Sequence, residues 1–250
     1  MTELVVENIF EIDPPDISHI ITEDDTPVGN LFSAKQQRLL IEPLYSSWQP
    51  LPDVTTQAPR LYLADANVGV FSTIHNPPLV PDMFLSLDVE IAEDWYAKEH
   101  RSYFIWEFGK PPDVAVEIVS NTKGQELTKK LREYARMRVG YYVVYDPQQL
   151  LQETVLSVYR LHFSKYIPQA EWVLEGVGLG LTLWEGSFEG KTAQWLRWVD
   201  LDGQLILTGA ERANLEHQRA EAERQRAEEA EARAARLLAQ LRAAGIDPEV

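Results

Sequence analysis

The chain has 250 residues, of which 45% are apolar and seven are Trp, so it can bury a sizeable core in one large domain, with or without an appendage. It contains no cysteine, which excludes disulfides, thiolate metal sites and a cysteine nucleophile, and its five scattered histidines lack the spacing of a zinc site. A net charge of −16 argues against simple nucleic-acid binding, which normally leaves a basic footprint.

The sequence gives no sign of a membrane segment. No apolar run approaches the roughly 20 residues that a membrane-spanning helix needs. The first residues, Met-Thr-Glu-Leu-Val-Val-Glu, lack the basic start of a signal peptide. We therefore expect a soluble, cytoplasmic protein with no membrane partner.

The first part of the chain divides into an acidic lead and the start of a domain. Residues 1–30 hold eight acids and no Lys or Arg, together with Asp13-Pro-Pro15, and are predicted to be partly irregular. A main domain is expected over residues 31–207. It opens with a predicted helix from Ser33, as N-cap, to about Trp48. Pro43 falls inside this helix and is expected to kink or end it.

The middle of the chain alternates between short strands and one helix. Strands are predicted over 60–64, 66–74, 82–89, 103–108 and 113–120, followed by a helix over 126–138 and a buried strand over 140–145. Further strands are predicted over 154–163, 170–175, 178–184 and 195–200. This order predicts an α+β or α/β domain built around a mixed sheet.

The C-terminal part differs in kind, since Glu, Arg and Ala dominate residues 208–245. Thr208 and Glu211 have the spacing of a capping box, so a long charged helix is predicted to begin there. Leucines are sparse along it, and the heptad pattern is weak in the middle. A solvated single helix and a coiled coil that joins two copies of the chain both remain open.

Two Pro-Asp pairs, each leading into an apolar strand, give the main functional hint. Asp82 starts the strand over 82–89, and Asp113 starts a strand that carries Glu117 in its middle. A carboxylate among apolar neighbours is costly to bury without a partner, and either a metal ion or a lysine could serve. The alternatives are that Glu117 faces solvent or pairs structurally with Lys130, and that Asp113 is a plain turn residue.

The helix over 126–138 supplies basic side chains to an otherwise acidic protein. Lys130 flanks its apolar side and can bend toward the sheet, although a lysine at a helix edge often has only a packing role. Other basic residues project outward and form a candidate nucleic-acid contact: Lys123, Lys129, Arg132 and Arg136. Two carboxylates on neighbouring strands with a nearby lysine are the groups that a Mg²⁺-dependent phosphodiesterase needs.

Three segments resemble the Uma-type putative restriction endonuclease family of the PD-(D/E)XK nuclease superfamily. They are Pro112-Asp-Val-Ala-Val-Glu-Ile-Val-Ser120, Lys130-Leu-Arg-Glu-Tyr-Ala135 and Gly140-Tyr-Tyr-Val-Val-Tyr-Asp-Pro147, with Pro81-Asp82 matching the upstream motif. The resemblance covers roughly residues 30–208. It implies a restriction-endonuclease-like mixed central sheet flanked by helices, and a charged C-terminal helix is a frequent appendage.

The resemblance also implies a site. Asp82 and Glu117 would bind Mg²⁺, with Mn²⁺ as a substitute, the Ile118 carbonyl would assist, and Lys130 would orient the attacking water. In the superfamily a lysine normally follows two residues after the Glu on the same strand. That position is Val119 here, and the family is understood to move the lysine to the following helix. A helix-borne acid is sometimes a further member, but around Ser33–Ile41 the chain offers Gln36 and Gln37, with Glu42 just beyond.

Two functions follow as hypotheses. The first is a metal-dependent endodeoxyribonuclease that hydrolyses DNA with metal-activated water, carried by Asp82, Glu117 and Lys130 and with Asp113 as an accessory residue. The second is a catalytically silent nuclease-fold protein that oligomerises or recruits a partner through its C-terminal helix. The acidic surface, the displaced lysine and the long C-terminal helix motivate the second, while the first is the leading hypothesis.

Overall fold

The computed structural model describes residue 16 and residues 30–53, 55–94, 96–120 and 125–244. The expected acidic lead therefore lies almost wholly outside the described residues, as does Lys123. The described chain forms two compact units, one ending at Ile206 and the other beginning at Leu207. None of the described helices combines the length and apolar composition that crossing a bilayer requires.

The first helix begins earlier than the sequence predicts and continues through Pro43 to nearly the predicted end. Helix α1 spans Leu31–Ser47, and its N-cap is Asn30, whose side chain accepts a hydrogen bond from the Ser33 N–H at 2.9 Å. Ser33 as N-cap was wrong, and so was an end at Pro43, because the helix continues through that residue. Burial of three leucines on α1, each worth about 1.5 to 3 kcal/mol, outweighs the roughly 3 kcal/mol cost of an internal proline.

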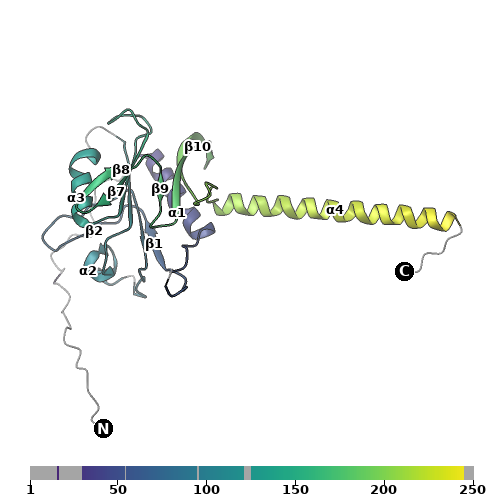
Figure 1. Ribbon diagram of the computed structural model, residues 1–250, viewed down its shortest axis with the longest axis horizontal. Coiled ribbons are helices and arrows are strands. Elements are labelled where there is room, and N and C mark those ends of the chain that lie inside the picture. The colour runs from purple at the N-terminus through teal and green to yellow at the C-terminus, as the bar shows by residue number, and fades with distance from the viewer. Residues whose placement is uncertain (1–15, 17–29, 54, 95, 121–124, 245–250) are drawn as a thin grey trace, which may run out of the picture. The chain divides into compact units, whose positions relative to one another are not determined.

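The centre of the larger unit is a six-stranded mixed sheet (Figure 1). Its strand order is β1-β3-β5-β6-β7-β8, and only the β5–β6 pair is parallel. The strands are β1 (Tyr62–Asp65), β3 (Met83–Leu87), β5 (Val114–Ile118), β6 (Tyr141–Tyr145), β7 (Leu156–His162) and β8 (Lys165–Pro168). With its flanking helices this is the restriction-endonuclease-like mixed fold that the resemblance implied, and β8 is the strand that the sequence reading missed.

The two faces of the sheet bury different partners because side chains alternate along each strand. On one face Val114, Val116 and Ile118 of β5 pack with Leu40 and Leu44 of α1. A second sheet of β11 (Lys191–Val199), β10 (Leu179–Phe188) and β9 (Val173–Leu174) covers the same face. The opposite face packs against α3 (Leu131–Met137) through its residues Tyr134 and Met137. The sheet is thus buried on both sides.

The second sheet extends beyond the predicted strands. Strands β10 and β11 pair over nine positions and are joined by Glu189 and Gly190, both with positive φ. Two such residues form the kind of tight turn whose twist suits a two-residue hairpin. Glu-Gly is a weaker sequence signal for this turn than Asn-Gly, which is why the predicted strands stopped at 184 and began at 195.

Several short elements replace longer predicted strands on the side of the sheet that carries α3. Residues 66–74 keep only β2 (Val70–Phe71), because Asn67 adopts a positive φ of 57° and breaks the extended run. The predicted strand over 103–108 divides into β4 (Tyr103–Phe104), paired with β2, and one helical turn, α2 (Ile105–Phe108). A single turn, η1 (Lys98–His100), precedes β4.

The helix predicted over 126–138 begins with an unusual turn. Residues Glu126–Lys130 form one turn of π-helix, η2, which leads directly into α3. A π turn takes more residues per turn than an α-helix and is frequent at functional sites. Helix α3 ends at Arg138, which adopts a left-handed conformation with φ of 68°.

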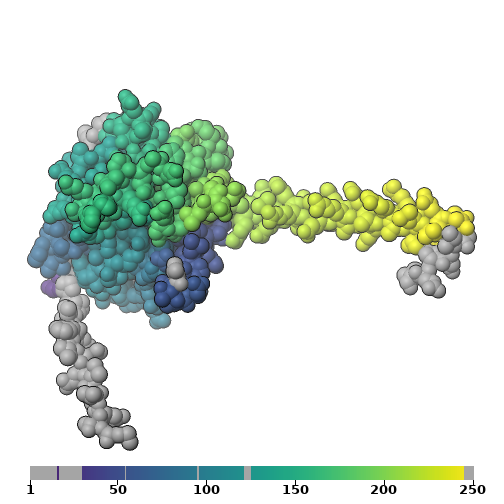
Figure 2. Space-filling model, in the orientation of Figure 1, coloured from purple at the N-terminus to yellow at the C-terminus, as the bar shows by residue number. Residues whose placement is uncertain are grey.

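The second unit is dominated by one long helix, α4 (Gly209–Ala243), a continuous rod in the space-filling view (Figure 2). Thr208 is its N-cap, and the capping box with Glu211 is present in both directions. None of its residues is buried, and Leu215, Leu237 and Leu241 are exposed. Ion pairs at i,i+4, such as Arg224 with Glu228 at 3.0 Å, support it.

Candidate active site

The candidate site lies where β3 begins and β5 ends. The antiparallel register pairs Met83 with Val116, so Asp82 and Glu117 are the next residues in line. Residues opposite each other in such a pair point to the same face, with Cβ atoms about 5 Å apart. The sheet thus brings the two acids together on the face that α3 covers.

Asp82 is held by contacts to both of its carboxylate oxygens. Its Oδ2 accepts the Ile118 N–H at 2.7 Å, and its Oδ1 accepts a hydrogen bond from Gln37 Nε2 at 2.9 Å. Burial raises the pKa of Asp82, while the Ile118 N–H, the charge of Lys130 and a side-chain hydrogen bond with Glu117 oppose that rise. These contacts fix the carboxylate beside Glu117.

Glu117 is buried, with 1% of its surface exposed, and carries two short hydrogen bonds. Lys130 Nζ lies 2.7 Å from Oε2, and the Tyr134 hydroxyl donates to Oε1 at 2.7 Å. Burial, reinforced by the charge of Asp82, raises the pKa of Glu117 to about 7, although Lys130 and Tyr134 pull it down. The carboxyl group therefore changes its protonation near neutral pH.

Lys130 reaches the sheet from the last position of η2. Burial tends to lower its pKa, but the charges of Glu117, Glu126 and Asp82 raise it overall, so the side chain stays an ammonium ion. Glu126, on the same turn, lies 3.8 Å from Lys130 Nζ through its Oε1 atom. The charges of three carboxylates, those of Glu117, Glu126 and Asp82, thus act on one ammonium group.

The donor set fits a hard divalent cation. Mg²⁺ is typically held by one or two carboxylates and completes its shell with water and substrate phosphate oxygens. Asp82 and Glu117 supply two carboxylates. Their negative charge exceeds the single positive charge of Lys130, and a bound cation would reduce this local excess. Within the described residues no group of three or more metal-binding side chains forms a closed protein cage.

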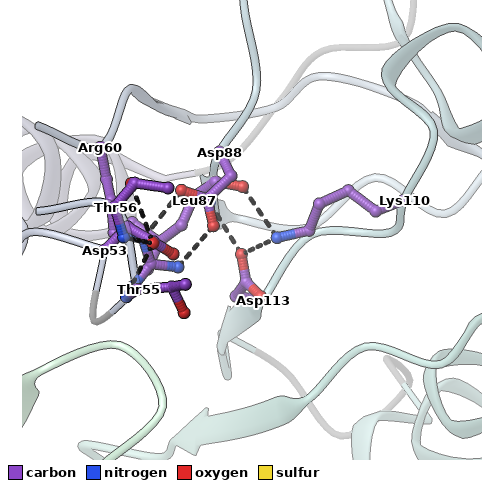
Figure 3. Close-up of polar contacts among 8 residues, drawn as sticks. All are labelled: Asp53, Thr55, Thr56, Arg60, Leu87, Asp88, Lys110 and Asp113. Atoms are coloured by element: carbon purple, nitrogen blue, oxygen red, sulfur yellow. Dashed lines mark hydrogen bonds and ion pairs between the residues drawn. The ribbon is translucent and has the colours of Figure 1, made fainter. Parts of the chain in front are cut away.

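Asp113 lies apart from this site. Its Oδ2 accepts hydrogen bonds from the Leu87 N–H at 2.7 Å and from Lys110 Nζ at 2.5 Å (Figure 3). Glu117 is four residues further along the strand, about 13 Å at the usual rise. Beside Asp113, Arg60 pairs with Asp88 at 2.6 Å (Figure 3). The structure therefore does not bring Asp113 together with Asp82 and Glu117.

One comparison with known proteins gave a match. The sequence model of the Uma2 family, described as "Putative restriction endonuclease", matches residues 22–183. The chain belongs to the Uma2 family. No curated protein and no solved structure matched it.

The Uma2 chain departs from the usual superfamily arrangement at one strand position, and its fold shows how. Val119, two residues after Glu117, is 2% exposed and packs in the core between the sheet and α3. A lysine there would be buried in that core. Lys130 instead approaches Glu117 from the adjoining turn, which agrees with the displaced lysine that the resemblance implied.

Helix α1 contributes a neutral side chain to the Uma2 site. Gln37 bonds Asp82 and also exchanges hydrogen bonds with the Asn67 side chain at 3.0 and 3.1 Å. Gln36 points elsewhere, to the backbone of Leu196. Glu42 is exposed further along α1.

Sequence reasoning gave little weight to two residues that contact the site. Tyr134 lies one turn beyond Lys130, and its hydroxyl donates a hydrogen bond to Glu117 Oε1. Glu126 is 6% exposed and lies on the same turn as Lys130. Its spacing of four from Lys130 was the available signal.

The outward-facing basic residues are placed as expected on the surface. Lys129, Arg132 and Arg136 are exposed on η2 and α3. Arg132 Nε donates to the Thr128 carbonyl at 3.2 Å, and Arg136 pairs with Glu133 at 3.1 Å. They form a positive strip on the same turn and helix that carry Lys130.

A cavity of about 480 Å³ opens on the same face of the sheet. Asp65 and Phe84 line it and are partners across β1 and β3, and Phe84 is two residues from Asp82, about 7 Å along the strand. Tyr96 and Arg101 add an exposed aromatic ring and a guanidinium to its wall. The cavity thus lies close to Asp82 and its neighbour Glu117.

Proposed function

We propose that this Uma2 protein is a Mg²⁺-dependent endonuclease that hydrolyses phosphodiester bonds of DNA. The observation that carries the proposal is the pairing of Asp82 and Glu117 across β3 and β5, with Lys130 2.7 Å from Glu117. Two neighbouring carboxylates and an ammonium group are the set that metal-assisted hydrolysis of a phosphodiester requires. Membership of a family of putative restriction endonucleases supports the same reaction and DNA as the substrate.

Each residue has a defined role in this proposal. Asp82 and Glu117 would hold Mg²⁺ or Mn²⁺, and Gln37 and the Ile118 N–H keep the Asp82 carboxylate oriented. When bound, the metal ion would lower the pKa of an attacking water and neutralise charge on the phosphate. Lys130 would position that water, or a phosphate oxygen, next to the two carboxylates.

The surroundings suit a strand of nucleic acid. Lys129, Arg132 and Arg136 are exposed beside Lys130 and can contact backbone phosphates, which supply most of the affinity in such complexes. The cavity with Tyr96 and Arg101 offers an aromatic face and a cation beside Phe84, on the strand that begins directly after Asp82. Because these contacts are to phosphates, we expect binding to DNA to weaken as salt rises, and the net charge of −16 should keep that binding weak.

The decisive experiment measures binding of Mg²⁺ and Mn²⁺ by calorimetry at low salt, followed by cleavage of plasmid and linear DNA. Wild type should bind one ion and nick or cut DNA, and Glu117→Gln should do neither while it remains folded. Glu133→Gln is the matched control, because it removes a partly exposed acid of α3 that pairs with Arg136, and it should leave both properties unchanged. Equal cleavage by wild type and Glu117→Gln would identify the activity as a contaminant.

A second function remains a proposal for a chain that fails this test. If neither ion binds, with or without DNA, the nuclease fold would act as a scaffold. The exposed leucines of α4 (Leu215, Leu237 and Leu241) favour that alternative, because they could dock against a second copy. Pairing through α4 is also compatible with an active nuclease.

A further inference from the structure

Glu126 is a buried acid that the proposed site does not yet use. Only 6% of its surface is exposed, and its Oε2 atom has no hydrogen-bond partner among the residues that the structure describes. Its position is fixed, because the Tyr142 hydroxyl donates to its backbone carbonyl at 2.9 Å. A buried carboxylate oxygen without a hydrogen-bond partner lowers the stability of the fold, so we expect a functional reason for Glu126 to be buried here.

The charged group next to Glu126 is Lys130. Glu126 Oε1 lies 3.8 Å from Lys130 Nζ, within ion-pair range but longer than a hydrogen bond, whereas Glu117 Oε2 holds the same nitrogen at 2.7 Å. The Lys130 ammonium therefore has two carboxylates within ion-pair range, of which Glu117 alone is at hydrogen-bond distance. Residues four apart on a helical turn are close neighbours, which keeps Glu126 in reach.

We propose that Glu126 is a positioning residue that takes over the Lys130 ammonium when a divalent cation binds Asp82 and Glu117. This inference rests on the proposed function. A cation on Glu117 repels an ammonium bound to the same carboxylate, so Lys130 must leave. A shift of about 1 Å brings Lys130 Nζ to the 2.7–2.9 Å of a charge-assisted hydrogen bond with Glu126.

The exchange has two consequences. It removes a competing cation from Glu117, and so favours metal binding. It also keeps Lys130 beside the carboxylates, where the lysine can act on the water or phosphate instead of swinging into solvent. Without Glu126, Lys130 would stay on Glu117 and compete with the metal ion.

A double-mutant cycle tests this by calorimetry with Mn²⁺ at pH 8. Glu126→Gln should bind Mn²⁺ about tenfold more weakly than wild type, the size expected when a partner of a ligand-contacting group is lost. Glu133→Gln, which removes an acid from the adjoining helix, should bind as wild type does. In a Lys130→Met background, Glu126→Gln should cause no further loss, because the effect is transmitted through the lysine.

An additive loss in the double variant would overturn the inference, since Glu126 would then act on the metal ion directly or through its charge alone. Wild-type affinity in a folded Glu126→Gln variant would also overturn it, while leaving the proposed function intact. Absence of Mn²⁺ binding to wild type would instead remove the proposed function and this inference with it. Thermal melting of each variant checks folding.

A second measurement needs no change at Glu126. In the full chain labelled with ¹⁵N-lysine, saturation with Mg²⁺ should shift the side-chain resonance of Lys130, which is identified by its loss in Lys130→Met. A resonance that stays in place when Mg²⁺ is bound would mean that Lys130 never leaves Glu117. That result would overturn the inference even if Glu126→Gln failed to fold.

Discussion

The ammonium group of Lys130 lies 2.7 Å from Oε2 of Glu117, although Lys130 belongs to a helical turn and Glu117 to the central strand of the sheet. The pair joins a side chain that is 28% exposed to one that is 2% exposed. The lysine thus connects the buried acid with the edge of the site. Its partial exposure is what a group needs if it is to meet a phosphate that arrives from solvent.

Glu117 should make the protein less stable as pH rises. Its pKa in the folded state, about 7, lies above the ordinary 4.5, so the folded protein keeps a proton that the unfolded chain loses. The free energy of unfolding should therefore fall between about pH 4.5 and pH 7, by roughly 3 kcal/mol from this group. Glu117→Gln, which cannot ionise, should melt about 6 to 12 °C higher than wild type at pH 8.

The control for that prediction is the same pair of proteins at pH 5, where the difference in melting temperature should be small. Adding Mg²⁺ at pH 8 should raise the melting temperature of wild type but not of Glu117→Gln, because an ion that binds only the folded state stabilises it. A melting temperature of wild type that rises steadily from pH 5 to pH 8 would contradict the raised pKa of Glu117.

Metal affinity should depend on pH through the same group. Metal ions bind the ionised carboxylate, so protonation of Glu117 below its pKa of about 7 competes with the ion. The apparent dissociation constant of Mg²⁺ should rise by close to tenfold for each pH unit below 7 and level off above 8. Calorimetry at pH 6, 7 and 8 measures this, and a flat profile would exclude Glu117 as a ligand that titrates in this range.

Replacing Lys130 should move the pH profile of cleavage upward. The charge of Lys130 and its hydrogen bond lower the pKa of Glu117, so Lys130→Met should raise that pKa and push the onset of activity to higher pH. We also expect cleavage at pH 8 to fall by about 10² to 10⁴-fold, as for loss of a group that assists proton transfer or charge stabilisation. Lys129→Met, on the exposed neighbouring position, is the matched control for the pH profile.

Asp113 should matter for stability and not for metal binding. Asp113→Asn weakens the hydrogen bonds to the Leu87 N–H and to Lys110, and should cost about 1 to 3 kcal/mol of unfolding free energy. Urea unfolding measures that cost, and calorimetry should give the wild-type affinity for Mg²⁺. A clear loss of Mg²⁺ binding in a folded Asp113→Asn protein would restore Asp113 as an accessory residue.

Deletion of residues 209–250 should change only properties that depend on α4. If α4 pairs two copies, light scattering should show a dimer for the full chain and a monomer for the shortened one. Leu237→Glu combined with Leu241→Glu is a gentler variant with the same expectation. The same mass per particle in all three proteins would argue against pairing through α4.

Local sequence signals were enough for most of the central sheet, but the pairing of the site residues depended on the strand register, which the sequence did not predict. Apolar runs behind Pro81 and Pro112 predicted β3 and β5, and the antiparallel register seen in the structure sets Asp82 opposite Glu117. Asp113 could not be separated from Glu117 by sequence, because both lie along one run. Only the three-dimensional fold shows that it lies beside Lys110.

Other features depended on packing that the sequence does not display. Pro43 stays within α1 because leucines around it are buried by β11 and the sheet, a tertiary contribution that exceeds the local penalty. Glu126 is buried, and its backbone carbonyl accepts a hydrogen bond from the Tyr142 hydroxyl, neither of which is visible from charge patterns. In both cases contacts between residues distant in the sequence outweighed the local preference, which is for proline to end a helix and for a glutamate to be exposed.

The π turn at Glu126–Lys130 makes this site sensitive to chain length as well as to composition. Adjacent residues of an α-helix differ by about 100° around its axis. Removal of one residue from the turn would therefore rotate Lys130 and Tyr134 away from their present contacts with Glu117. A single-codon deletion here would therefore separate both side chains from Glu117 while leaving every functional residue type in the chain. Related proteins could lose their chemistry in this way with all recognisable motifs intact.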